Sequence, residues 1–198
     1  MNKEIEVKIQ IPNNILRKTK EWLHKHATHI GSIHHIEYYL NKPKTTFFFE
    51  APGGYKDARD YLRVRLTKNG DSLCYKKFHE DPIEKRPLYC DEYEVTVSDG
   101  ETTLELMKAL GYTEQTRVEK ERTIYHFDCF EIVVDEVKNL GTFMEVELKK
   151  TVPNAKIGIT LIYNFLRMIG VNQFKLQTRG YVSMLWNPTY DFGKEVVL

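Results

Sequence analysis

The sequence lacks an excess of charge of either sign. Its 198 residues include 29 lysines and arginines against 28 aspartates and glutamates, which gives a formal net charge of +1 at pH 7. Proteins that hold nucleic acid or anionic membranes through their overall electrostatic field are strongly basic. The balance excludes such a field here. Recognition of a charged ligand must therefore depend on the local arrangement of charged side chains.

Long apolar runs are also missing. No stretch approaches the roughly 18–20 consecutive apolar residues that a membrane helix needs. The first ten residues, MNKEIEVKIQ, carry charges where a secretory signal has its apolar centre. We therefore expect a cytoplasmic protein with no membrane partner.

Cysteine is scarce. Cys74, Cys90 and Cys129 are odd in number and widely spaced, which favours reduced thiols over a disulfide framework or a zinc cluster. Hydrophobic residues make up 41% of the chain, enough for a sizeable core. At this length we expect a single domain over residues 1–198, in which residues 151–198 form a helical segment that closes the fold.

The apolar periodicity predicts an α+β protein that is mostly β. Strands are expected at residues 3–11, 30–40, 61–68, 72–79, 90–98, 113–127, 130–138 and 143–150. Helices are expected at residues 13–26, 101–110 and 154–169, while residues 174–187 mix strand and helix signals. This pattern predicts a closed eight-stranded antiparallel β-barrel with flanking helices.

Charged residues recur at alternate positions on six of these strands. Glu4, Glu6 and Lys8, for example, share one face of the first strand, and Ile5 and Val7 lie on the other. The basic members of the charged faces are Lys8, Arg63, Arg65, Lys76, Lys120 and Arg122. The acidic members are Glu4, Glu6, Glu92, Glu94, Asp135, Glu145 and Glu147. If the apolar faces pack outward against other layers, these charges point together into the barrel, which has room for one small ligand.

Charges confined in this way indicate a function, because desolvating a buried ion pair can cost more than its Coulombic attraction returns. Arginine and lysine clusters suit a polyphosphate. Carboxylate clusters suit Mg²⁺ or Mn²⁺, which often bridge to substrate phosphates. Together they predict a metal-assisted site for phosphoryl or nucleotidyl transfer.

Several of these segments resemble the motifs of one known family. Glu4-Ile5-Glu6-Val7-Lys8 is similar to the Glu-x-Glu-x-Lys opening of the triphosphate tunnel metalloenzymes, or CYTH family, which includes class IV adenylyl cyclases and thiamine triphosphatases. Further matches follow in the family's order at residues 62–65, 75–76, 91–94, 118–122, 134–135 and 140–147. Residues 180–185 resemble the terminal Ser-Tyr-x-x-Leu-Leu motif, with Gly180 in place of the serine.

The resemblance implies a tunnel that holds a triphosphate, and it implies a role for each matched residue. Divalent metal, Mg²⁺ or Mn²⁺, would be held by Glu4, Glu6, Asp135, Glu145 and Glu147. The phosphates would be bound by Lys8, Arg63, Arg65, Lys76, Lys120 and Arg122. Glu92 and Glu94 are secondary candidates that could instead orient the arginines. The catalytic candidates are Glu4, Glu6 and Lys8, and neighbouring cations could lower the pKa of Lys8 so that it transfers a proton.

Two departures from the cyclase branch favour hydrolysis. Residues 35–40 read His-Ile-Glu-Tyr-Tyr-Leu where that branch has Gln-x-Asp-x-Tyr-Phe, and residues 62–65 read Leu-Arg-Val-Arg, as in phosphatase-like members. We expect a metal-dependent triphosphatase acting on inorganic triphosphate, a nucleoside triphosphate or thiamine triphosphate. The alternatives are a class IV adenylyl cyclase, which makes cyclic AMP and pyrophosphate from ATP, and a non-catalytic polyphosphate-binding protein. A nucleic-acid partner is not expected, because acid balances base on the charged strands.

Two matters stay open at this stage. The chain could be a monomer or a homodimer. Five histidines between His24 and His35 are most simply a solvated surface, although pH sensing or incidental metal binding would also fit.

Overall fold

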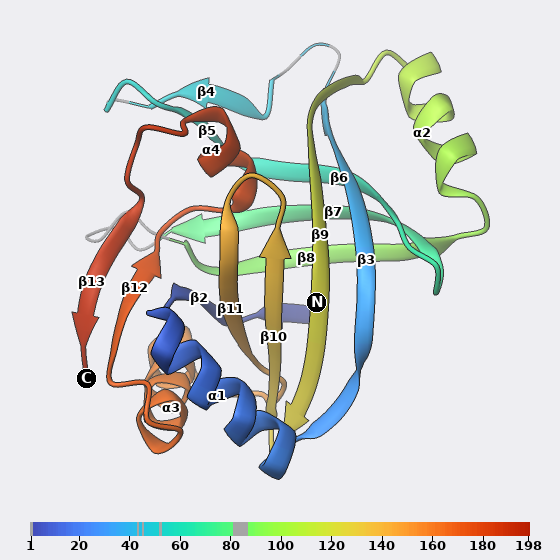
Figure 1. Ribbon diagram of the computed structural model, residues 1–198. Coiled ribbons are helices and arrows are strands. Elements are labelled where there is room, and N and C mark those ends of the chain that lie inside the picture. Colours follow the sequence, from blue (N-terminus) through green and yellow to red (C-terminus); the bar gives the residue numbers. More distant parts are fainter. Residues whose placement is uncertain (1, 43, 45, 52, 81–86) are drawn as a thin grey trace.

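The computed structural model describes residues 2–42, 44, 46–51, 53–80 and 87–198, with the side chains of residues 2–4, 80, 87 and 88 also outside the described part. The strands of the main sheet are β1 (Asn2–Glu4), β2 (Glu6–Gln10), β3 (Thr28–Asn41), β6 (Asp60–Leu66), β7 (Asp71–Glu80), β8 (Pro87–Val97), β9 (Thr113–Phe127), β10 (Phe130–Val137), β11 (Gly141–Leu148), β12 (Gln173–Gln177) and β13 (Gly193–Val197). A separate hairpin comprises β4 (Phe48–Glu50) and β5 (Lys56–Ala58). The helices are α1 (Asn13–His26), α2 (Gly100–Ala109), α3 (Ala155–Met168) and α4 (Tyr181–Trp186) (Figure 1).

The prediction of a closed eight-stranded barrel is wrong. Within the described residues the main sheet has 11 strands in the order β1-β8-β7-β6-β3-β9-β10-β11-β2-β12-β13, with β1 and β13 at its two ends. Every pairing in it is antiparallel. The predictions of a mostly β protein and of flanking helices agree with the structure.

Two features of the pairing explain the difference. The single strand expected at residues 3–11 is divided at Ile5, so that β1 pairs with β8 while β2 pairs with β11. The other edge of β2 is taken by β12, which in turn pairs with β13. The C-terminal strands β12 and β13 therefore extend the sheet beyond β2. The strand count from the sequence left both out, because residues 174–187, which include most of β12, carry both strand and helix signals and no strand is expected at residues 193–197.

The sheet is strongly bent. Figure 1 shows β6, β7 and β8 running across the direction of β3, β9 and β10, so that the two halves of the sheet face each other across a concave side. Such bending follows from the right-handed twist of neighbouring strands. It brings residues from strands far apart in the sheet order into one enclosed region.

Local signals in the sequence set the limits of the helices. The Asp99 side chain accepts a hydrogen bond from the Thr102 N–H at the start of α2, and the Asn154 side chain accepts one from the Ile157 N–H at the start of α3. Between β6 and β7, the expected Asn69-Gly70 turn is present, and Gly70 has a φ of +131°, a conformation that favours glycine. The three helices expected from periodicity are confirmed, with their ends within one residue or two.

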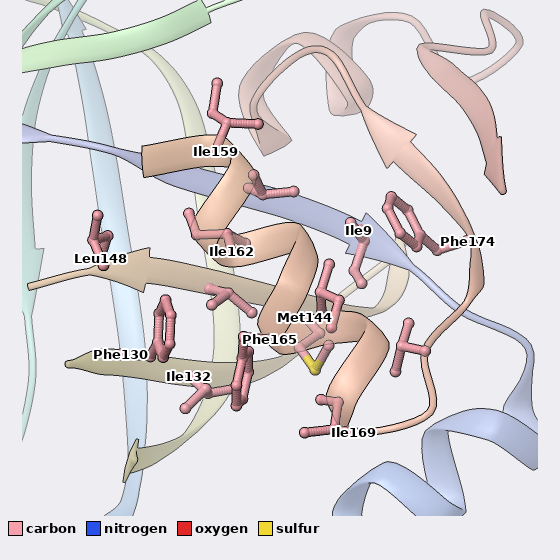
Figure 2. Close-up of a cluster of buried hydrophobic side chains, with 14 of the residues drawn as sticks. Ile9, Phe130, Ile132, Met144, Leu148, Ile159, Ile162, Phe165, Ile169 and Phe174 are labelled. Carbon is pink, nitrogen blue, oxygen red and sulfur yellow. The ribbon is translucent and has the colours of Figure 1, made fainter. Parts of the chain in front are cut away.

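The largest hydrophobic cluster lies on the convex side of the sheet. Figure 2 shows α3 presenting Ile159, Ile162 and Phe165, with Ile169 just after its end, to apolar side chains of β2, β10, β11 and β12. Among those facing side chains, Ile9 is completely buried. Gly158 allows the close approach of α3, because a Cβ atom there would lie 3.0 Å from the Ile5 side chain. With the apolar faces used on this side, the alternate residues of the same strands must point into the concave side.

Two smaller clusters complete the core. One joins β3, β6 and β9 to α4 and contains Tyr39, Tyr61, Val118 and Val182. The other places Leu104 of α2 over the outer side of β3 and β6. No helix in the described part of the chain is both long and apolar enough to cross a membrane. The single domain expected over residues 1–198 stays a prediction.

The packing of α3 can be tested with a matched pair of isoleucines on that helix. Ile162→Ala should lower the free energy of unfolding by about 2–5 kcal/mol, because it leaves a cavity at a side chain with no exposed surface. Ile157→Ala should change it by less than about 1 kcal/mol, because that side chain is 42% exposed. Urea unfolding measures both values. Equal losses in the two variants would contradict the placement of the core.

Candidate functional site

The concave side of the sheet holds a cavity of about 960 Å³. All six basic residues that the sequence singles out line it: Lys8, Arg63, Arg65, Lys76, Lys120 and Arg122, called here the six cavity cations. They come from β2, β6, β7 and β9, which alternation and sheet bending bring together. The cavity is also lined by Glu6, Glu92, Glu94, Glu145 and Glu147.

One ion cluster joins β2, β9, β10 and β11. The Arg122 guanidinium donates to both carboxylate oxygens of Asp135, at 2.7 and 2.5 Å, and to Glu145 Oε2 at 2.6 Å. Lys8 Nζ lies 2.9 Å from Glu145 Oε1, and the Tyr181 hydroxyl donates to Asp135 at 2.9 Å. Two of the proposed metal ligands, Asp135 and Glu145, are therefore already in contact with cations.

A second cluster centres on Glu37 of β3, whose side chain is completely buried. Its Oε1 atom accepts a hydrogen bond from Arg65 Nε at 3.0 Å and lies 3.2 Å from Arg63 Nη1 and 3.5 Å from Lys120 Nζ. Its Oε2 atom accepts a hydrogen bond from the Tyr39 hydroxyl at 3.0 Å. One carboxylate thus holds cations from three positions on two strands.

A third group occupies β7 and β8. Glu92 Oε1 lies 3.4 Å from Lys76 Nζ and 3.9 Å from Arg63 Nη2. Glu94 accepts from Arg65 at 3.3 Å and from the Ser72 hydroxyl at 2.7 Å. Glu92 and Glu94 thus each contact an arginine of the cavity, and whether they orient the arginines or bind metal stays a prediction.

The buried charges shift one another's pKa values strongly. Burial alone would raise the pKa of Glu37, but Arg63, Lys120 and Arg65 together hold it well below its ordinary value. Burial would likewise raise the pKa of Glu145, and Lys8 and Arg122 hold it well below the ordinary value. Both carboxylates are therefore ionised at neutral pH, and each acts as a fixed negative charge.

The two buried lysines behave in opposite ways. A lowered pKa was expected for Lys8, but although burial lowers it, the charges of Glu145 and Glu6 outweigh burial, and its pKa is raised. Lys120 has the lowered pKa, about 8, because burial and the neighbouring Arg122 together exceed the attraction of Glu37 and Asp135. The geometry therefore gives the more easily released proton to Lys120.

The proposed metal ligands are only partly brought together. Glu6 and Glu147 face each other in the β2–β11 register and both line the cavity, next to Glu145. Glu147 also lies 2.7 Å from Lys149 Nζ. The Glu4 backbone lies in β1, but its side chain is outside the described part of the structure. The donors that are described are carboxylate oxygens, which fit a hard divalent cation.

A different trio of side chains has the tightest spacing of potential ligand atoms. Within the described residues, Cys74, Glu92 and Glu94 offer ligand atoms that all lie within 4.8 Å of one another. However, burial raises the pKa of the Cys74 thiol to about 12, and the thiol donates a hydrogen bond to Glu92. A protonated thiol beside Arg63 and Lys76 is a poor ligand, so this trio does not replace the proposed set.

Sequence reasoning missed several residues of the site. Glu37 is compared with the cyclase pattern only as a lengthened acid and Tyr39 only as its retained tyrosine. Yet both alternate with Ile36 and Tyr38 in the same way as the residues of the charged strands do. Arg179 lines the cavity and donates to the buried Asp57 at 2.5 Å, which joins the β4–β5 hairpin to the C-terminal segment. No short motif marks that pair, because its members are far apart in the chain.

The remaining sequence features are also placed by the structure. His35 alone of the five clustered histidines is buried, while the His24 ring contacts Tyr125 and His34 contacts Glu121 on the surface. Gly180 lies against Tyr61, where a Cβ atom would be 3.0 Å from the tyrosine hydroxyl. A serine at this position would therefore require the Tyr61 side chain to shift by a few tenths of an ångström.

Comparison with known proteins identifies the family. The model of the CYTH domain matches residues 2–181. The chain belongs to the CYTH family. This match covers the strands that carry the six cavity cations and the carboxylates around them, so the resemblance drawn from the motifs is confirmed.

Individual relatives agree with this assignment. A Methanocaldococcus jannaschii protein named "Putative adenylate cyclase" is 27% identical over 145 residues, which are 73% of this CYTH chain and 74% of the relative. The PH1819 protein of Pyrococcus horikoshii OT3 has a TM-score of 0.75 at 25% identity, covering 93% of this chain and 99% of that one. A Hippeastrum protein, described as an adenylyl cyclase candidate with a dominant triphosphatase activity, has a TM-score of 0.66 at 14% identity, covering 96% and 98% of the two chains.

The lowered pKa of Lys120 predicts a specific pH dependence of stability. Between pH 8 and the ordinary value of 10.5, the unfolded chain binds the Lys120 proton and the folded chain does not, so stability should rise with pH. Between pH 7 and pH 9.5, we expect the free energy of unfolding of the wild type to gain about 2 kcal/mol relative to that of Lys120→Met. Urea unfolding at the two pH values measures this. A difference that stays constant would show that Lys120 has an ordinary pKa.

Proposed function

We propose that this CYTH protein is a divalent-metal-dependent phosphohydrolase that acts on a triphosphate-containing substrate bound in the cavity. The convergence of the six cavity cations in one cavity of about 960 Å³ carries the proposal. Guanidinium and ammonium groups bind phosphate oxygens through charge-assisted hydrogen bonds. The volume lies at the upper end of small-molecule sites, so inorganic triphosphate and larger organic triphosphates would both fit.

The charge balance of the cavity supports metal dependence. Among the described residues, ten lysines and arginines line the cavity with eight aspartates and glutamates, and the buried Glu37 and Asp135 bring the carboxylates to ten. Such a site has no net positive charge with which to draw in a polyanion. A divalent cation that enters with the phosphates would supply it, and the family resemblance implies Mg²⁺ or Mn²⁺.

The residues fit the separate tasks of the reaction. Glu6, Glu145 and Glu147, together with Glu4, would hold the metal, which supplies charge neutralisation of the phosphate oxygens. Arg63, Arg65, Lys76 and Lys120 would bind and align the phosphates, and they would stabilise charge that develops in the transition state. Glu6 and Glu147, which face each other in the β2–β11 register and line the cavity, would orient a water for in-line attack on the terminal phosphorus. Lys8, in contact with Glu145 and with a raised pKa, serves as a fixed cation in this arrangement.

Adenylyl cyclase activity is the second candidate, and the name of the Methanocaldococcus relative favours it. The same cations would hold ATP, and the nucleophile would be the ribose 3′-oxygen with attack at the α-phosphorus. The Hippeastrum protein has the same fold and is described as mainly a triphosphatase, so the fold accommodates hydrolysis. The two activities differ in which phosphorus lies beside the nucleophile.

Product analysis separates the candidates. Purified protein with Mg²⁺ or Mn²⁺ is given ATP, inorganic triphosphate or thiamine triphosphate, and orthophosphate, pyrophosphate and cyclic AMP are resolved. We expect orthophosphate from at least one substrate and no cyclic product. Cyclic AMP with equimolar pyrophosphate would establish the cyclase instead. Binding without turnover under both metals would leave a polyphosphate-binding protein.

The metal assignment predicts a large effect at Glu6. Glu6→Gln keeps the shape of the side chain but removes its charge, and metal-dependent turnover should fall roughly a hundredfold or more. Glu195→Gln, the same change at an exposed residue of β13, should leave turnover unchanged. Initial rates at saturating metal measure the effect, and circular dichroism checks that both variants fold. Wild-type turnover in Glu6→Gln would rule out Glu6 as a metal ligand.

A further inference from the structure

The carboxylate of Glu37 is buried behind the wall of the cavity. Arg63, Arg65 and Lys120 line the cavity, whereas Glu37 has no exposed side-chain surface and lies behind them. All three cations approach the same atom, Oε1, at 3.0–3.5 Å. A ligand in the cavity therefore meets three cations that share one buried carboxylate as a partner.

The contacts with Glu37 use only part of the donors of these cations, and Glu92, Glu94 and Asp135 contact others. A guanidinium group has five N–H donors, and Glu37 accepts a hydrogen bond from one nitrogen of Arg65 and lies 3.2 Å from one nitrogen of Arg63. Arg63 Nε is buried, and within the described residues it has no hydrogen-bond partner. Buried donors of this kind are ordinarily satisfied, so Arg63 Nε is an exception in this cluster.

Glu37 is itself held firmly. Its Oε2 atom accepts the hydrogen bond of the buried Tyr39 hydroxyl. His35, on the same face of β3, lies 3.9 Å from Oε1, and burial lowers the pKa of the imidazole, so it adds no further positive charge at neutral pH. The Tyr39 hydrogen bond and the three cation contacts together hold the carboxylate in place.

We propose that Glu37 is a positioning residue that aligns Arg63, Arg65 and Lys120 for phosphate binding and, by its charge, keeps the affinity for polyphosphate low enough for turnover. This rests on the proposed function. A carboxylate in contact with three cations offsets part of their attraction for phosphate. Without that charge the cations hold a polyanion more tightly but in a less defined geometry, and a displacement of about 1 Å can cost a hundredfold in rate.

The decisive variant is Glu37→Gln, which keeps the length of the side chain and removes its charge. We expect imidotriphosphate, a triphosphate analogue with nitrogen bridges, to bind about tenfold more tightly in the presence of Mg²⁺, and kcat to fall at least tenfold. Calorimetry gives the affinity, and initial rates on the substrate found by product analysis give kcat. Glu121→Gln is the matched control, because Glu121 lies on β9 between Lys120 and Arg122 but points to the exposed side. It should change neither quantity.

A second variant covers the case in which Glu37→Gln does not fold. Glu37→Asp keeps the charge but withdraws it by one methylene group. We expect its affinity for imidotriphosphate to stay within about twofold of the wild type while kcat falls. Wild-type kcat in Glu37→Asp would overturn the positioning role. Unchanged or weaker binding in a folded Glu37→Gln would overturn the role in limiting affinity.

The failure of this proposal is distinguishable from failure of the proposed function. If the wild type neither binds imidotriphosphate nor hydrolyses any triphosphate, the proposed function is wrong. If the wild type does both, and Glu37→Gln and Glu37→Asp match it in both quantities, only the role of Glu37 is wrong.

Discussion

The structure depends on the neutralisation of charges that are buried together. Glu37, Asp135 and Glu145 lie among the cavity cations, and each is in contact with at least two of them. Burying an ion without a partner of opposite charge costs several kcal/mol. Removal of any one of these charges would therefore leave another buried charge with fewer partners. The fold must therefore pair β2, β3, β6, β9, β10 and β11 in registers that bring these carboxylates into contact with the cavity cations.

The apolar face of the same strands enforces that register. Ile9, Val134 and Met144 pack under α3 on the convex side, while Lys8, Asp135 and Glu145 alternate with them and point the other way. A slip by one residue would send every charge into the apolar core and every apolar residue into the cavity. The hydrophobic cluster thus fixes which side chains face the cavity, and the ion pairs fix where along the strands they meet.

Alternation is local, and for this reason the sequence alone predicts much of the site. A period of two identifies the strands and shows that Lys8, Arg63, Arg65, Lys76, Lys120 and Arg122 share the inner face. Pairing between distant strands is not local. The division of the first strand at Ile5 and the extension of the sheet by β12 depend on which edges meet in three dimensions, and the closed barrel was wrong for that reason. Glu37 escaped notice as a site residue because its importance comes from partners 26, 28 and 83 positions away.

The same charge balance bears on catalysis. A cavity of cations alone would bind a triphosphate tightly and would release phosphate products slowly, since each product keeps much of the charge that holds the substrate. In the role proposed for Glu37, the buried carboxylate would reduce that attraction while leaving Arg63, Arg65 and Lys120 aligned. Strong binding would then require a further contribution, from a bound metal ion or from the charge that develops in the transition state. Interactions that are stronger in the transition state than in the ground state are the ones that raise turnover.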